Sequence, residues 1–126
     1  CVLRALHFVT ENERVQKEVE ALKGGNIDQF LAQVKASGDS SYKYLQNVYS
    51  TKDIKQQNVS VALMISEMSL GGNGVCRVHG GGFAGTVQAF VPNDMVDEFK
   101  SKIEAVLGEG MCHILSIRPV GGYRLI

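Results

Sequence analysis

A glycine-rich loop is the part of this sequence whose residue types are best suited to chemistry. Four of its six residues are glycine, and it joins two segments rich in β-forming residues. Its members are Gly80, Gly81, Gly82, Phe83, Ala84 and Gly85. Glycine reaches backbone conformations closed to other residues and lets a ligand approach the main chain, and successive main-chain N–H groups form a concavity suited to phosphate. Composition leaves open the alternative of a mobile hairpin tip that binds nothing.

The loop carries neither of the glycine motifs of the common nucleotide-binding folds. It matches neither the GxGxxG dinucleotide fingerprint nor the GxxxxGK[ST] phosphate loop, so the folds with those motifs are not implied. Arg77 and His79 precede the loop and are candidate ligand contacts. An arginine on a solvated strand face and a histidine in a packing role would explain the same two residues. Phe83 is expected to anchor the loop by hydrophobic packing.

The composition is that of an ordinary folded domain. Of the 126 residues, 44% are hydrophobic and 21% charged, and 13 basic residues balance 13 acidic ones. This balance gives no electrostatic reason to expect a nucleic acid or an anionic membrane as partner, and no apolar run approaches the ~20 residues that span a bilayer. The three cysteines have no CxxC spacing, which favours a reducing, cytoplasmic setting. The three histidines form no metal-ligand motif, so no protein-held metal is expected.

Helices are predicted where apolar residues recur every three or four positions before a glycine, and strands where apolar residues alternate. In chain order, the predicted elements are a helix from Leu6 ending at Gly24–Gly25, a helix from Asn26 to Gly38, a short helical stretch from Ser40 to Val48, a helix from Asn58 to Gly71, strands over Val75–His79 and Thr86–Val91, a helix from Asn93 to Gly108, and a strand over Cys112–Arg118. Asn26 is the predicted N-cap of its helix, with Gln29 three residues on as in a capping box.

This order predicts an α+β fold with helices packed on one face of a small, mostly antiparallel sheet, similar to a ferredoxin-like split βαβ unit. The chain is expected to be a single domain over residues 1–126. Residues 1–57 would form an N-terminal helical extension, and residues 58–126 the helix-strand-strand-helix-strand part. A complete ferredoxin-like unit needs one more strand before the helix at Asn58. Because the sequence has no initiator Met, we expect it to be a fragment of a longer polypeptide.

The glycine loop and its flanks resemble the third signature of the GHMP small-molecule kinases, in its galactokinase form. That signature reads Arg-Met-Thr, then Gly-Gly-Gly-Phe-Gly-Gly, then a strand. The matching residues are Arg77, Gly80, Gly81, Gly82, Phe83 and Gly85. Upstream, Arg4–Val9 followed by Glu11 and Arg14 is similar to the family's Arg-Ala-x-His-Val stretch and the residues after it, and Ala21–Gly25 followed by Phe30 is similar to its next helix–turn–helix. The resemblance covers nearly the whole chain.

The resemblance implies the C-terminal domain of a two-domain kinase that transfers the γ-phosphate of ATP to the anomeric hydroxyl of galactose. In such a kinase the loop Gly80–Gly85 would approach the nucleotide phosphates or the sugar at the boundary with the N-terminal domain. That domain would hold the other two signatures, the catalytic aspartate and most contacts to ATP and Mg²⁺, so no catalytic residue is expected in this chain and the chain alone is expected to be inactive. His7 and Arg14 are expected to hold helices together.

Three positions depart from the family pattern. His79 replaces its usual Thr, Ala84 replaces a glycine, and Ser50–Gln56 replaces a Cys-Pro-Glu-Leu-Asp stretch. These departures leave the identity of the sugar open and keep two alternatives. The first is a non-catalytic galactokinase-like sensor of sugar and nucleotide, and the second is a free-standing ligand-binding domain of ferredoxin-like type.

Overall fold

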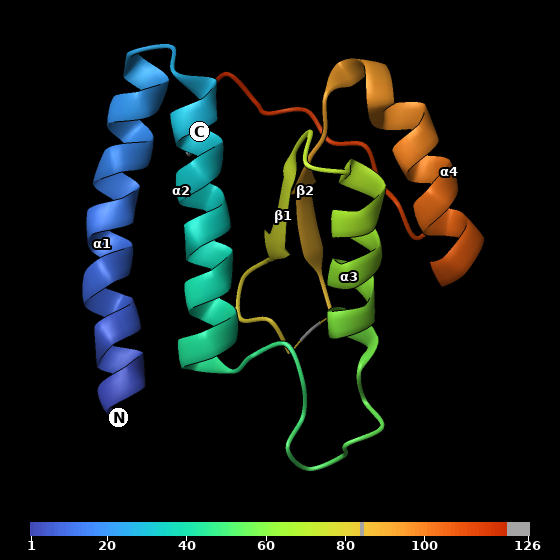
Figure 1. The fold of residues 1–126 in the computed structure, drawn as a ribbon, viewed down its shortest axis with the longest axis horizontal. Coiled ribbons are helices and arrows are strands. Elements are labelled where there is room, and N and C mark those ends of the chain that lie inside the picture. The colour runs from blue at the N-terminus through green and yellow to red at the C-terminus, as the bar shows by residue number, and fades with distance from the viewer. Residues whose placement is uncertain (84, 121–126) are drawn as a thin grey trace, which may run out of the picture.

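Helices flank both faces of a two-stranded antiparallel hairpin in the computed structural model, which describes residues 1–83 and 85–120 (Figure 1). The elements are α1 (Val2–Lys23), α2 (Ile27–Ser40), the π-helical segment η1 (Ser41–Leu45), α3 (Asn58–Leu70), β1 (Val75–Val78), β2 (Val87–Phe90), the 3₁₀ turn η2 (Asn93–Met95) and α4 (Val96–Leu107). The predicted α+β class and the antiparallel sheet are confirmed.

The turn between α1 and α2 forms as its sequence predicts. Helix α1 ends at Gly24, whose N–H donates to the carbonyl of Glu20 at 2.9 Å. Asn26 then caps α2, because its Oδ1 accepts from the N–H of Gln29 at 3.0 Å. Such a cap contributes about 1 kcal/mol to a helix. The two helices therefore run antiparallel and side by side (Figure 1).

Gly38 does not end α2, contrary to the prediction. The helix continues through it to Ser40 and passes directly into η1, so the predicted new start at Ser40 is also wrong. A methyl group at Gly38 would lie 2.7 Å from the Cβ of Arg77 and 3.4 Å from its Cα. Gly38 is therefore a site of close helix–strand contact, where the missing side chain lets α2 approach β1.

One face of the hairpin forms the core with α3 and α4. Because the register pairs Cys76 with Ala89 and Val78 with Val87, these four side chains share that face. Cys76 packs in one buried cluster with residues of α3 and α4, namely Leu70, Phe99 and Ile103. Val78 packs in a second buried cluster with Val48 and Val59. The predicted apolar stripe of α4 is thus the one that supplies Phe99 and Ile103 to the core.

The other face of the hairpin is covered by α2, with α1 outside it (Figure 1). Phe30 of α2 meets Phe90 of β2 edge to face, with ring centroids 5.5 Å apart, and Arg77 lies against Gly38. The N-terminal helical extension thus forms a second layer of the fold. The apolar residues that predicted α1 remain largely exposed, and Ala21 is the buried residue of this helix.

Other differences lie at element ends. Residues 112–118 are not a strand in the described part of the chain, since β1 and β2 pair only with each other there and an extended segment needs a hydrogen-bonded neighbour. Both hairpin strands are shorter than predicted. The cap of α3 is Gln57, and Asn93 opens η2 without a side-chain cap. No helix among the described residues has the length and apolar character to cross a membrane.

Candidate functional site

The glycine loop closes the β1–β2 hairpin with main-chain hydrogen bonds at its base. The N–H of His79 donates to the carbonyl of Thr86 at 2.9 Å, and the N–H of Gly85 donates to that of Gly82 at 2.9 Å. Gly80, Gly82 and Gly85 have φ values of 60°, 86° and 87°. These left-handed conformations suit glycine and strain other residues. The glycine content of the loop therefore follows from its backbone path.

Gly82 packs closely against another segment of the chain, whereas Gly80 and Gly81 are exposed. Gly82 is buried, and a methyl group there would lie 2.2 Å from the carbonyl oxygen of Asn47. At Gly80 and Gly81, by contrast, no described atom lies within 4 Å of such a methyl group. No acceptor among the described residues takes a hydrogen bond from the N–H groups of Gly80, Gly81 and Gly82. Gly80 and Gly81 are exposed and Gly82 is buried, so two of these three donors lie on exposed residues of the loop.

Phe83 does not anchor the loop within this chain, contrary to the expectation. Its side chain is 72% exposed, because no neighbouring element of the described chain covers it. The contact that holds the loop is made by Gly82 and Asn47. His79 is exposed beside the loop, and Ala84 lies outside the described residues. Sequence reasoning missed Asn47, which is 34 positions from Gly81 and sits in no recognisable motif.

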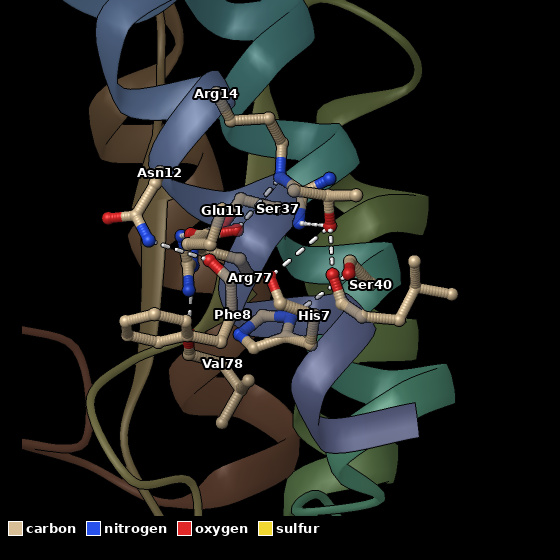
Figure 2. A network of polar contacts seen from close by, with 11 residues as sticks. His7, Phe8, Glu11, Asn12, Arg14, Ser37, Ser40, Arg77 and Val78 are labelled. Carbon is tan, nitrogen blue, oxygen red and sulfur yellow. Dashed lines mark hydrogen bonds and ion pairs between the residues drawn. The ribbon is translucent and has the colours of Figure 1, made fainter. Parts of the chain in front are cut away.

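Arg77 lies in a polar network between β1, α2 and α1 (Figure 2). Its Nη1 donates to Ser37 Oγ at 2.5 Å and lies 3.7 Å from Glu11 Oε1. Ser37, which is fully buried, donates in turn to that carboxylate. Arg77 Nε donates to the carbonyl of Val78 at 3.1 Å. The guanidinium therefore links the strand before the loop to both helices.

Glu11 is the acceptor at the centre of this network. Its Oε2 accepts from Arg14 Nε at 2.8 Å, while Oε1 faces Ser37 and Arg77. Burial raises the pKa of Glu11, but the Ser37 hydrogen bond and the charges of Arg14 and Arg77 outweigh it and leave that pKa below its ordinary value. Burial and the nearby charge of Glu11 raise the pKa of Glu18. Glu11 is thus held as the charged partner of two arginines.

His7 and Arg14 have structural contacts. His7 Nδ1 and Ser40 Oγ are 2.9 Å apart and join α1 to α2, as expected. Arg14 acts within α1, where it donates to Glu11 and, through Nη2, to Thr10 Oγ1 at 3.1 Å. Cys76 is buried in the core, and this burial, followed by the charge of Glu67, raises the pKa of its thiol to about 11. Cys76 is therefore no candidate nucleophile. No group of three or more His, Cys, Asp or Glu in the described chain is arranged to hold a metal ion.

Comparison with known proteins relates most of the chain to galactokinases. It is 33% identical over 100 residues to the galactokinase of Haemophilus influenzae, a match that covers 79% of this chain and 24% of that protein. The galactokinases of Glaesserella parasuis and Pasteurella multocida are each 30% identical over 100 residues, with the same coverage. No protein-family model matches the chain, and no solved structure matches it significantly.

The matched region spans about a quarter of the length of these curated relatives, and it lies in their C-terminal part. The similarity thus confirms the family suggested by the glycine loop and its flanks. This chain is galactokinase-like and corresponds to the C-terminal part of these relatives.

Proposed function

We propose that this chain is the C-terminal domain of a longer galactokinase-type sugar kinase, and that its glycine loop contacts the phosphates of ATP or the sugar at the boundary with the N-terminal domain. The whole protein would transfer the γ-phosphate of ATP to the anomeric hydroxyl of galactose. The relatives named galactokinase support this assignment for the family. The fragment by itself would be inactive, since it would lack the catalytic aspartate.

The observation that carries the proposal is the exposed part of the loop. The N–H groups of Gly80 and Gly81 have no acceptor among the described residues, and no side chain outside the adjacent residues lies within 4 Å of a methyl group built at either position. Main-chain donors held in this way suit an anion. In phosphoryl transfer most of the catalytic effect comes from positioning and from stabilising charge on the phosphoryl oxygens. Donors fixed in advance at the loop would contribute to both.

Mg²⁺ would be held elsewhere in the whole kinase. The described residues offer no cluster of metal-ligating side chains, and the loop supplies donors, whereas Mg²⁺ takes oxygen ligands. When bound with ATP, the ion would neutralise charge on the phosphates. This chain would then position the nucleotide through the main-chain N–H groups of Gly80 and Gly81.

The exposed apolar side chains of α1 support a second domain as partner. Leu6, Val9, Val15, Val19 and Leu22 are each more than 40% exposed. Burial of apolar side chains such as these against another domain is favourable. We propose that the N-terminal domain of the same kinase covers part of this helix.

The protein would act in the cytoplasm.

The test is a kinase assay on the full-length protein that contains this chain. ADP release is measured with galactose, with a panel of other sugars, and without sugar as the control for background ATP hydrolysis. Sugar-dependent release with galactose is the expected result. If no sugar gives turnover but calorimetry detects ATP and galactose binding, the non-catalytic sensor is the better assignment. Absence of both turnover and binding would contradict the proposal.

A further inference from the structure

The glycine loop is held in place by Asn47, a residue from a different part of the chain. In Figure 1 the loop lies at the lower end of the hairpin, beside the chain that leaves η1. Asn47 is 2% exposed, and its Nδ2 donates to the carbonyl of Gly81 at 3.3 Å. Its own carbonyl oxygen and Cγ lie so close to Gly82 that a methyl group there would be 2.2 Å and 2.8 Å away from them. Asn47 therefore contacts two successive residues of the loop.

Asn47 is itself fixed by the helical segment before it. Ser41, also 2% exposed, donates from Oγ to Asn47 Oδ1 at 3.1 Å. Because Oδ1 accepts this bond, Nδ2 is the atom directed at the loop. The N–H of Gln46 donates to the carbonyl of Ser41 at 3.1 Å and closes the last turn of η1. Both polar ends of the Asn47 side chain are thus used, one on the helix and one on the loop.

The backbone at this point is strained, which indicates that the position of Asn47 is imposed by its surroundings. Gln46 has φ 54° and ψ 42°, and it is the only described residue other than glycine with a positive φ. Such a conformation costs about 1–3 kcal/mol and persists where neighbouring contacts determine it. Here those contacts include Val48, which is 2% exposed and packs on Val78. A π-helical turn such as η1 is also frequent at functional sites.

We infer that Asn47 is the positioning residue of the glycine loop, and that it sets the orientation of the loop N–H groups toward phosphate without touching the substrate itself. This inference rests on the proposed function. The N–H groups of Gly80 and Gly81 serve as preorganised donors only if the loop keeps one conformation, and these two residues have few other contacts in the described chain. The bond from Asn47 to Gly81 and its packing against Gly82 supply that constraint.

An isosteric variant separates the hydrogen bond from packing. Asn47→Asp keeps the volume of the side chain and an oxygen that accepts from Ser41, but it has no N–H to donate to Gly81. Asn73→Asp is the control for loss of a side-chain amide hydrogen bond, because Asn73 Nδ2 donates to the carbonyl of Leu70 at the same 3.3 Å. Asn73 lies before β1, whereas the loop follows it. Both variants thus remove one amide–carbonyl bond and add one carboxylate, which is buried in Asn47→Asp and exposed in Asn73→Asp.

Two readouts are measured on the full-length kinase. The first is hydrogen–deuterium exchange across residues 79–86, which include the paired N–H groups of His79 and Gly85. In Asn47→Asp this exchange is expected to be roughly fivefold faster than in the wild type, as suits the loss of one hydrogen bond. The second is the kinetics of ADP release. Here kcat/KM for ATP is expected to fall by about tenfold or more, because a small misplacement of positioning groups is costly.

The outcomes separate this inference from the proposed function. Faster exchange confined to the loop, with a fall in kcat/KM for ATP and no such change in Asn73→Asp, supports the positioning role. Asn47→Asp behaving like Asn73→Asp in both readouts would overturn it. So would faster exchange spread over the whole chain, since Asn47 would then be a general structural residue. A wild-type protein without turnover would overturn the proposed function. The exchange comparison would still show whether Asn47 holds the loop.

Discussion

Replacement of Gly82 by alanine should distort the glycine loop far more than the same replacement at Gly85. The two residues have nearly equal φ values, 86° and 87°. Their surroundings differ. A methyl group at Gly82 would lie 2.2 Å from the carbonyl oxygen of Asn47, whereas no described atom lies within 4 Å of a methyl group at Gly85. The pair therefore compares equal backbone strain with and without a steric clash.

The expected cost follows from two contributions. A left-handed alanine costs roughly 1–2 kcal/mol, and the smaller freedom of the unfolded chain returns about 0.4–1 kcal/mol. Gly85→Ala should therefore lower the free energy of unfolding by about 1 kcal/mol. Gly82→Ala carries the same cost and adds a contact shorter than real Cβ atoms adopt. Forcing extra atoms into a packed site costs about 1–3 kcal/mol, so its total loss should be about 2–4 kcal/mol.

Urea denaturation followed by circular dichroism measures both variants against the wild type. The expected result is a lower midpoint for Gly82→Ala than for Gly85→Ala, with unchanged m-values. Combining Gly82→Ala with Asn47→Ala is expected to restore little, because the carbonyl of residue 47 remains in place. Equal losses in the two single variants would refute the reasoning, since Gly82 would then not be pinned against Asn47.

Two further predictions concern the helix layer. Gly38→Ala should lower the free energy of unfolding by about 1 kcal/mol. Alanine is about 1 kcal/mol better than glycine in a helix, but the added methyl group would lie 2.7 Å from the Cβ of Arg77, and such overpacking costs about 1–3 kcal/mol. A variant that is more stable than the wild type in urea denaturation would contradict the close contact. Because the pKa of Glu11 is lowered in the fold, its ion pairs stabilise the protein above the ordinary value of 4.5, and this contribution is lost as the pH falls through the lowered pKa. Between pH 6 and pH 3 the wild type should therefore lose more stability than Glu11→Gln in thermal unfolding, and parallel pH profiles would show that the network contributes nothing.

The sequence predicted those features whose causes are local. The cap of α2 at Asn26, the end of α1 at Gly24 and the core stripe of α4 depend on residues a few positions apart, and each forms as predicted. The prediction that Gly38 ends the helix is wrong because position 38 requires glycine for its close contact with Arg77, a residue distant in sequence. The strand expected over 112–118 failed for a related reason, since alternation alone provides no partner strand.

The same distinction applies to the candidate site. Glycine composition predicted the left-handed backbone of the loop, but not what holds it. Two supports come from the helical half of the chain. Ser37 and Glu11 bind Arg77 before the loop, and Asn47 binds Gly81 within it. These contacts join residues separated by more than 30 positions, and no local sequence pattern predicts them.

These two supports argue against a mobile hairpin tip. A mobile tip would need no contact beyond its own strands, whereas this loop is fixed on the α2–η1 side at Arg77 and again at Gly82. The N–H groups of Gly80 and Gly81 have no acceptor among the described residues. The arrangement also keeps Gln46 in a left-handed conformation that costs free energy. A hairpin turn that binds nothing would not require this cost. The helical extension therefore supplies the contacts that hold the loop, and a change at Asn47 or Ser41 should alter the loop although neither residue lies in the glycine motif.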